Sequence, residues 1–320
     1  MSDMDPRLAR TVLVANQKGG VGKSSIVAAI GGMLAGPDRR VLIVDADQQG
    51  NVTRSDLGVD GDRGQSLAMA LQYTQPLTPL RDVRPGLDIV PGGPHLATVG
   101  AMVATASSSG LDIAANLAAT LADLCAQERY ALVLIDSGPG DAPMLDALLD
   151  TARYLLVPSC DDDASLEGVE LLANRYLRAR RRGSVIDLLG VVLFNVNPRA
   201  NVRNAQVLAN IQAMLEGSGA APFEALIRTD KAAAVDLRAR HLTPVELVAV
   251  AAGCGVRGRL NRCPKVRGGG RHQRQAHQGR ADRRTLGRLH SQGNVRYAGG
   301  LRNPGAVGFH HGIGRHGGDG

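Results

Sequence analysis

The chain has 320 residues, with three Phe, five Tyr and no Trp, so aliphatic side chains must supply its core. So few aromatic rings argue against a single-strand nucleic-acid binder that stacks bases. The four cysteines show none of the short paired spacings of zinc sites or disulfide frameworks, and neither a signal segment nor an apolar run of about 18 residues is present. These features predict a soluble protein of the reducing cytosol.

The net charge of +7 is distributed unevenly along the chain. Residues 1–254 carry 23 Lys and Arg against 28 Asp and Glu, whereas residues 255–320 carry 14 against 2, a balance of +12. The latter segment also holds 17 Gly and six of the eight His, and its apolar residues follow neither a helical nor a strand period. We therefore predict one folded domain over residues 1–250 and a disordered Gly/Arg/His-rich tail over residues 251–320.

Short β-branched runs alternate with longer Ala/Leu-rich stretches over the first 250 residues. This pattern is typical of βαβ units and predicts an α/β fold with a mostly parallel sheet flanked by helices. The predicted strands are 11–15, 40–45, 87–91, 130–136, 153–158, 188–194 and 223–227. The predicted helices are 23–35, 111–127, 142–151, 164–182, 202–216 and 230–240.

The first predicted strand leads into a glycine-rich loop and then a helix, with residues 16–25 reading NQKGGVGKSS. Glycines let successive backbone N–H groups surround a phosphate, and the helix N-terminus adds positive charge. In such a loop Lys23 neutralises phosphate oxygens and the Ser24 hydroxyl ligates Mg²⁺. The predicted phosphate-binding residues are Gly19, Gly20, Val21, Gly22, Lys23, Ser24 and Ser25.

Residues 18–24, KGGVGKS, resemble the deviant Walker A motif of the ParA/MinD group of P-loop ATPases, which includes the partitioning ATPases ParA and Soj. Residues 44–51, VDADQQGN, are similar to the second ParA-type motif, with Gln48 replacing the usual Pro. Residues 132–136, LVLID, resemble a Walker B strand, although Ser-Gly-Pro follows where the family commonly has Ala-Pro-Pro. The resemblance covers residues 11 to about 248 and implies a P-loop NTPase fold.

The resemblance also implies ATP and Mg²⁺ as cofactors and a role for each polar residue of these motifs. Lys18 is expected to cross the interface of an ATP-bound homodimer and, with Asp47, to act in hydrolysis. From the residues alone, a solvated loop lysine is an equally good interpretation of Lys18. The predicted magnesium ligands are Ser24, Asp45 and Asp136. Ordinary strand-end residues are the alternative for Asp45 and Asp136, and a helix cap is the alternative for Asp47.

Further candidates lie in the second half of the chain. Asn195 follows an apolar strand where related ATPases recognise the adenine edge, and a turn-forming Asn is the alternative. A region that resembles the non-specific duplex-DNA surface of ParA-type proteins contains Arg199, Arg203 and Lys231. The arginines that end the helix predicted over 164–182 favour a solvated face over a nucleic-acid patch, and the three Asp of residues 161–163 favour a helix cap over a metal cluster.

The resulting prediction is a cytoplasmic, nucleoid-associated ATPase for chromosome or plasmid partitioning. It is expected to hydrolyse ATP slowly, to bind double-stranded DNA non-specifically as an ATP-dependent homodimer, and to be stimulated by a ParB-like partner. The alternative is a MinD-like positioning ATPase that acts on a membrane or another cargo. Residues 255–320 lack the amphipathic basic helix that such a protein needs, so no stable membrane association is expected.

The sequence after residue 250 departs from the family, whose members continue with at least one more helix packed on the sheet. Here the chain changes to Gly, Arg and His, a composition typical of GC-rich coding DNA translated in a shifted frame. We therefore predict a frameshift near residue 250, which would leave apolar surface uncovered, with a genuine basic tail as the alternative.

Overall fold

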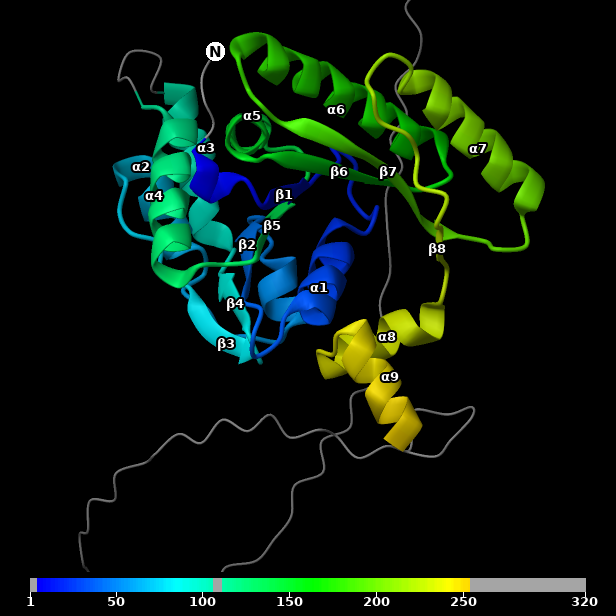
Figure 1. The fold of residues 1–320 in the computed structure, drawn as a ribbon, viewed down its shortest axis with the longest axis horizontal. Helices are drawn as coiled ribbons and strands as arrows, with labels where there is room; N and C mark the ends of the chain where they lie inside the picture. Colours follow the sequence, from blue (N-terminus) through cyan, green and yellow to red (C-terminus); the bar gives the residue numbers. More distant parts are fainter. Residues whose placement is uncertain (1–4, 106–110, 254–320) are drawn as a thin grey trace, which may run out of the picture. The chain divides into compact units, whose positions relative to one another are not determined.

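The computed structural model describes residues 5–105 and 111–253, which belong to one compact unit. Their eight-stranded sheet has the order β3-β4-β2-β5-β1-β6-β7-β8 (Figure 1). The strands are β1 (Thr11–Val14), β2 (Val41–Ala46), β3 (Leu80–Arg84), β4 (Leu87–Val90), β5 (Leu132–Ser137), β6 (Tyr154–Ser159), β7 (Asp187–Val196) and β8 (Ile227–Arg228). All neighbours pair in parallel except β3 and β4, so the predicted α/β fold with a mostly parallel sheet is confirmed.

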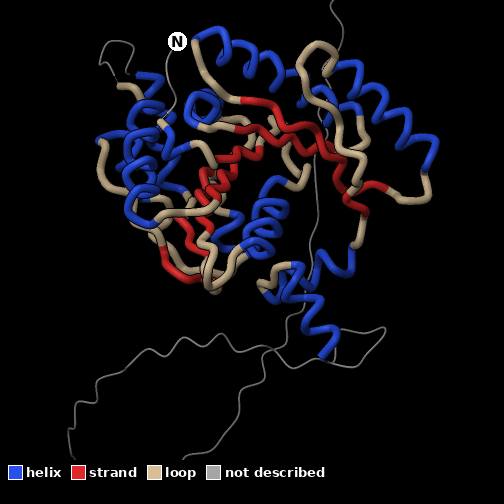
Figure 2. The backbone as a smooth tube through the Cα atoms, in the orientation of Figure 1, coloured by secondary structure: helices blue, strands red, loops and turns tan. Residues whose placement is uncertain are grey.

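Helices lie on both faces of this sheet (Figure 2). They are α1 (Lys23–Leu34), α2 (Gln65–Tyr73), α3 (Ala97–Thr105), α4 (Ile113–Glu128), α5 (Ala142–Thr151), α6 (Asp163–Arg182), α7 (Asn201–Met214), α8 (Lys231–Arg240) and α9 (Pro244–Gly253). A π-helical segment, η2, spans Asn51–Asp56. Within the described residues, no helix is both long and apolar enough to cross a bilayer.

The strand β2 shows how the sequence builds two cores. Its side chains alternate between faces, with Leu42 and Val44 in the apolar cluster that also contains residues of α2, α4, α5, α6 and α7. Val41 and Ile43 pack on the opposite face with α1. Because both faces of this parallel strand are buried, its sequence is a continuous apolar run rather than an alternating one.

The sequence analysis missed the helices α2 and α3, which contribute Leu67, Leu71 and Val99 to the core, and several elements at the margins of the fold. The strand β3 is an antiparallel edge strand with an irregular register, and its charged sequence LRDVR hides the strand pattern. The predicted strand at 223–227 is confined to β8, Ile227–Arg228, at the opposite edge. The helix α9 begins with a capping box, in which the Thr243 N–H donates to Glu246 Oε2 at 2.7 Å. This T-x-x-E signal was present in the sequence.

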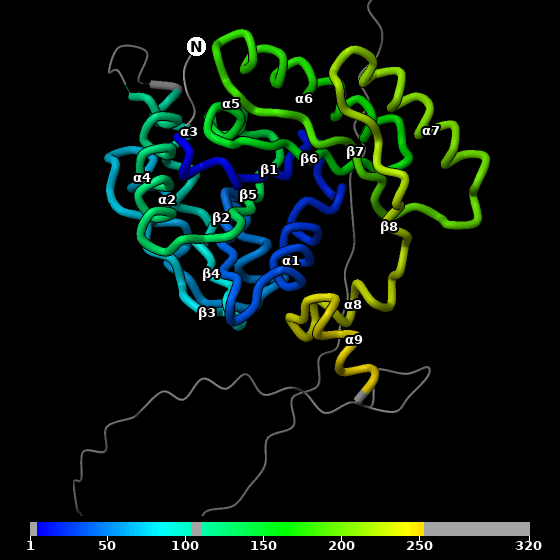
Figure 3. The backbone as a smooth tube through the Cα atoms, viewed as in Figure 1, coloured from blue at the N-terminus to red at the C-terminus, as the bar shows by residue number. Residues whose placement is uncertain are grey.

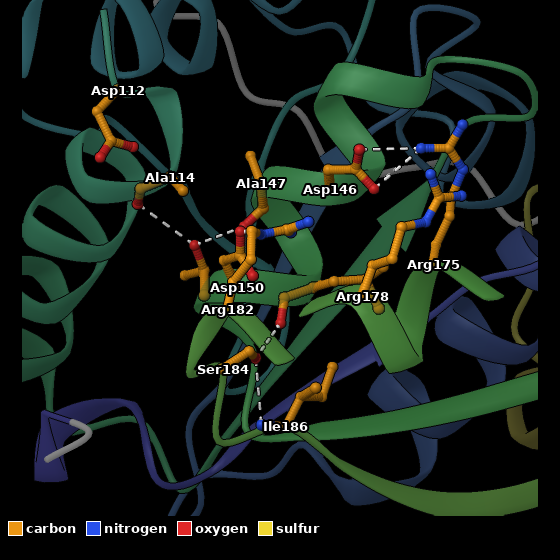
Figure 4. A network of polar contacts seen from close by, with 12 residues as sticks. Asp112, Ala114, Asp146, Ala147, Asp150, Arg175, Arg178, Arg182, Ser184 and Ile186 are labelled. Atoms are coloured by element: carbon orange, nitrogen blue, oxygen red, sulfur yellow. Dashed lines mark hydrogen bonds and ion pairs between the residues drawn. The ribbon is translucent and has the colours of Figure 1, made fainter. Parts of the chain in front are cut away.

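The cap predicted at residues 161–163 is confirmed, because Asp162 is the N-cap of α6 and accepts from the Ser165 N–H at 2.9 Å. No group of three or more His, Cys, Asp or Glu in the described part of the chain is arranged to hold a metal ion. Two of the five arginines near the end of α6 pair with α5, Arg175 with Asp146 and Arg182 with Asp150 (Figure 4), and Arg180 pairs with Asp187 of β7. These ion pairs support a structural role for that helix face over a nucleic-acid patch.

Candidate functional site

Three strands end at one edge of the sheet and bring their polar residues together there. The register pairs Asp45 at the end of β2 with Asp136 at the end of β5, and pairs Val14 at the end of β1 with the same Asp136. The loop between β1 and α1 starts from this edge. Ligands of open α/β sheets bind outside the carboxyl ends of the strands, so this edge is the candidate site.

The loop conformation depends on glycine at defined positions. Gly20 and Gly22 have φ of +79° and +88°, in the left-handed region that other residues rarely adopt. A Cβ placed on Gly19 or Gly20 meets no atom within 4 Å, so the loop borders open space. A Cβ on Gly22 would lie 2.6 Å from the ring of Phe194, which packs against the loop from β7.

Lys23 is the first residue of α1, and its side chain is buried below the loop. Its Nζ donates to the backbone carbonyl of Lys18 at 3.0 Å. Burial lowers the pKa of Lys23, and the carboxylates of Asp136 and Asp47 oppose this shift. The loop therefore contains a desolvated cation that an anion could neutralise.

Ser24 and Asp136 form the centre of the site. Ser24 Oγ donates to Asp136 Oδ2 at 2.7 Å. The other oxygen, Oδ1, is buried and has no hydrogen-bond partner among the described residues. Burial raises the pKa of Asp136 well above its usual range, and the charge of Asp45 raises it further. A hydroxyl beside a carboxylate with an unpartnered oxygen fits Mg²⁺, which prefers one or two such ligands with water and phosphate.

Asp45 is fully buried, and its carboxylate is engaged within the fold. Its Oδ2 accepts from the Thr53 N–H at 2.9 Å and from Thr53 Oγ1 at 2.6 Å. Burial raises the pKa of Asp45 to about 6. Neither Asp45 nor Asp136 lines the cavity described below, so the role of each as a magnesium ligand stays a prediction.

Asp47 lies one residue beyond the end of β2, where the chain turns at Gly50 with φ of +59°. Its Oδ1 accepts from the Gln49 N–H at 2.9 Å and its Oδ2 from Asn51 Nδ2 at 3.2 Å. The following helical segment has Gly50 as its N-cap and no side-chain cap, so Asp47 is not a helix cap. Both of its oxygens are instead held at the border of the cavity.

A cavity of about 360 Å³ opens over the loop, within the range of about 300–1,000 Å³ that is usual for small-molecule sites. Its lining combines the loop with residues from η2, β7 and α8, namely Gly19, Gly20, Gly22, Lys23, Ser24, Ser25, Asp47, Gln49, Asn51, Ser55, Asp56, Pro139, Phe194 and Arg238. A loop rich in donors with a buried cation, beside a carboxylate cluster, can bind a phosphate and a divalent cation together.

Comparison with known proteins agrees with this chemistry. The AAA domain family profile matches residues 9–184. The chain is 36% identical to the chromosome-partitioning ATPase Soj of Thermus thermophilus over 160 residues, which are 50% of this chain and 58% of that protein. It is 30% identical to the chromosome partitioning protein ParA of Caulobacter vibrioides over 210 residues, 64% of this chain and 76% of the relative. The chain belongs to the ParA/Soj-type P-loop ATPases.

A solved structure extends this likeness to most of the fold. Cobyrinic acid a,c-diamide synthase from Mycobacterium smegmatis, solved with a bound ATP analog and magnesium, is 26% identical with a TM-score of 0.56. The similarity covers 77% of this chain and 96% of that chain. The resemblance to the ParA/MinD group that the motifs indicated is thus confirmed at the level of family and fold.

The cavity of this ParA-type chain includes residues that sequence reasoning missed, chiefly Asp56 and Arg238. Burial raises the pKa of Asp56 to about 6, opposed by the charges of Arg238 and His241. His241 Nδ1 lies 2.9 Å from the Ser55 carbonyl, which joins the end of α8 to η2. Only this long-range packing brings Arg238 to the cavity, so no local sequence signal could have revealed it.

Two predicted site residues lie on the surface near the cavity. Lys18 is exposed, and its N–H donates to Asn16 Oδ1 at 2.9 Å. Asn195 is exposed with φ of +59° and is not among the cavity-lining residues, although its neighbour Phe194 is. An adenine contact by Asn195 therefore stays a prediction.

The three candidate DNA contacts lie at or after the carboxyl ends of β7 and β8. Arg199 and Lys231 are exposed. Arg203 is exposed as well, but its Nε pairs with Asp161 Oδ2 at 2.9 Å. Of these three candidates, Arg203 is thus paired and Arg199 and Lys231 make no ion pair within the described residues, and the role of all three in binding DNA stays a prediction.

The loop geometry generates a prediction about stability. We expect Gly22→Ala to lower the free energy of unfolding by about 1–3 kcal/mol, because the position requires a positive φ that alanine rarely adopts and the added methyl group would overlap the Phe194 ring. Gly19→Ala is the matched control, and its effect should stay within about 0.5 kcal/mol because its methyl group points into open space. Urea denaturation without nucleotide measures both. Equal effects of the two variants would contradict this account.

Proposed function

We propose that this chain is a nucleotide-dependent switch for partitioning chromosomes or plasmids. In this proposal it binds ATP with Mg²⁺, forms a homodimer in the ATP state, binds double-stranded DNA non-specifically in that state and hydrolyses ATP slowly. A ParB-like partner stimulates hydrolysis, and DNA binding associates the protein with the nucleoid. The observation that carries the proposal is the cluster of buried Lys23, half-buried Ser24 and buried Asp136 below a loop with positive φ at Gly20 and Gly22.

Each part of the cluster has a task that its surroundings support. The amides of residues 19–25 and the Lys23 ammonium bind the phosphates. Ser24 and Asp136 would hold the metal ion, with Asp45 behind them, and bound Mg²⁺ supplies charge neutralisation at the phosphates. Asp47 orients a water molecule, since its carboxylate borders the cavity and is itself oriented by Gln49 and Asn51.

Lys18 is assigned to the dimer. Its backbone is fixed by Asn16 and by the Lys23 ammonium, while its side chain is exposed beside the cavity. Its ammonium makes no hydrogen bond or ion pair within the residues that the structure describes. The Lys18 ammonium can therefore reach a nucleotide bound to a second copy of the chain. This role agrees with the place of Lys18 in the deviant Walker A motif. No observation favours the MinD-like alternative.

Nucleotide-dependent dimerisation is the first test. With ATP and Mg²⁺ we expect dimers and turnover far below the roughly 10 s⁻¹ of typical enzymes. Lys23→Ala should lose nucleotide binding, Lys18→Ala should bind ATP but stay monomeric, and Asp47→Ala should dimerise without hydrolysis. Size-exclusion chromatography and phosphate release measure these properties. A wild-type monomer in every nucleotide state would contradict the dimer switch.

DNA binding needs a test that separates the domain from the basic residues 255–320. After deletion of that segment, duplex binding should require ATP and Lys18, because only the dimer aligns two copies of Arg199 and Lys231. Binding by residues 255–320, whose net charge is +12, should instead be the same with every nucleotide. Its affinity should fall by about 0.9 log units for each log unit of salt concentration and each phosphate contacted. Filter binding with ATP, with ADP and without nucleotide distinguishes the two. Loss of all binding on deletion would contradict a DNA site in the domain.

The position of Arg238 predicts a nucleotide contact from α8. Since its side chain lines the cavity, Arg238→Ala should weaken ATP binding by about tenfold, the scale of one charge-assisted hydrogen bond. Arg178→Ala, which removes an exposed arginine of α6 outside the cavity, is the matched control and should leave the affinity unchanged. Titration with a fluorescent ATP analogue measures both. Equal affinities of the wild type and Arg238→Ala would remove Arg238 from the site.

A further inference from the structure

The π-helical segment η2 places a carboxylate beside the candidate site that the proposed switch does not use. Asp56 is the last residue of η2 and lines the cavity over the glycine loop, together with Ser55. The Asp56 carboxylate makes no hydrogen bond and no ion pair within the residues that the structure describes. An ionised carboxylate only accepts hydrogen bonds, so Asp56 is available to accept one from a ligand in the cavity.

The backbone of η2 explains how Ser55 and Asp56 come to line the cavity. The Leu57 N–H donates to the Val52 carbonyl at 2.9 Å, so this turn contains one residue more than a turn of α-helix. Val52 and Leu57 are both buried in the apolar cluster that includes residues of α1, and they fix the two ends of the wide turn. Turns of this kind occur frequently at functional sites.

Helix α8 brings positive charge to the same part of the cavity. It follows β8 along the chain (Figure 3), contacts η2 and contributes the lining residue Arg238. The end of α8 is fixed at His241, whose Nδ1 lies 2.9 Å from the Ser55 carbonyl and whose own carbonyl accepts from Arg84 Nη2 at 2.7 Å. Arg238 and Asp56 attract each other but form no ion pair, so the carboxylate keeps its capacity to bind a third group.

The Asp56 carboxylate lowers the stability of the nucleotide-free domain. Burial raises the pKa of Asp56 to about 6, and the charges of Arg238 and His241 offset this effect only in part. Ionisation is therefore less favourable in the folded chain than in the unfolded chain, and the cost is fully present above pH 6. Departures from the most stable arrangement are expected at functional sites, so this cost agrees with a ligand-binding role.

The chemistry of ATP limits what Asp56 can contact. The phosphates bind at the glycine loop and Lys23, and a carboxylate repels them. A divalent cation at Asp56 would be repelled by Arg238 and His241. The hydrogen-bond donors of ATP are the two ribose hydroxyls and the adenine amine, so Asp56 must accept from one of these.

The ribose is the nearer of the two donor groups, because it is joined directly to the phosphates. Asp56 lines the same cavity, of about 360 Å³, as the phosphate-binding residues Ser24 and Ser25. Carboxylates also bind ribose hydroxyls in other nucleotide-binding α/β folds. Both considerations favour a sugar contact over a contact with the base.

We propose that Asp56 accepts a hydrogen bond from a ribose hydroxyl of the bound nucleotide and makes the site selective for ribonucleotides. Asp56 is then a specificity-determining residue of the site, and the ribose lies against η2. This inference rests on the proposed function, because it requires a nucleotide in the cavity.

The first test compares ATP with 2′,3′-dideoxy-ATP, which lacks both ribose hydroxyls. In titration calorimetry with Mg²⁺, the wild type should bind ATP about tenfold more tightly, the scale of one hydrogen bond to a charged group. Asp56→Ala should bind both nucleotides with the same, weaker affinity, whereas Asp56→Asn should retain part of the preference because its amide oxygen still accepts. The matched control is Asp60→Ala, which removes an exposed aspartate outside the cavity and should keep the full preference.

The outcomes separate this inference from the proposed function. Wild-type protein that binds no nucleotide would overturn both. ATP binding without a preference over the dideoxy nucleotide, or a preference that survives Asp56→Ala, would overturn only the ribose contact. Inosine triphosphate lacks the adenine amine. If Asp56→Ala removes discrimination against inosine triphosphate and leaves the dideoxy preference intact, Asp56 contacts the base and the proposal is wrong.

The second test needs no nucleotide. At about pH 8 the wild-type carboxylate is ionised, so Asp56→Asn should raise the urea midpoint of the nucleotide-free protein by removing a desolvated charge. Asp60→Asn should leave the midpoint unchanged, since Asp60 is exposed. An unchanged or lower midpoint for Asp56→Asn would show that the carboxylate is satisfied within the fold, and would overturn its assignment to a ligand.

Discussion

Burial of carboxylates at the carboxyl edge of the sheet is the constraint on which the site depends. Asp45 and Asp136 are fully buried on adjacent strands, and burial raises the pKa of both. Thr53 donates to one oxygen of Asp45 and the Asp47 N–H to the other, whereas Ser24 donates to only one oxygen of Asp136. One buried oxygen of Asp136 is therefore left without a partner among the described residues. The fold therefore contains an uncompensated cost that a bound cation would offset, which links ligand binding to stability.

The glycine loop is held from several directions by elements distant in sequence. Asn16 donates from Nδ2 to the carbonyl of Pro158 in β6 at 2.8 Å and accepts the Lys18 N–H with its other side-chain atom. Gly168 of α6 approaches so closely that a Cβ there would lie 2.5 Å from Asn16 Oδ1. Contacts of this kind fix the backbone of Lys18 while its side chain is exposed, which is the preorganisation that a binding site needs.

Charge is organised differently in the domain and in the segment after it. Several cations of the described domain are paired, such as Arg175 with Asp146 and Arg203 with Asp161. The net positive charge of the chain comes instead from residues 255–320. The basic isoelectric point of the whole chain therefore does not indicate that the domain binds nucleic acid. A nucleic-acid-binding surface on the domain has to be inferred from cations that lie close together on it.

The sequence by itself determined the glycine-rich loop, the strand β5 that contains Asp136 and most helices, because these follow from local periodicity and from backbone conformations that only glycine adopts readily. Only the tertiary structure decided that Asp45 is held by Thr53, and that Asp56, Phe194 and Arg238 line the cavity. These features depend on contacts between residues far apart in sequence. Local patterns cannot encode them, because such contacts are set by how helices and strands pack.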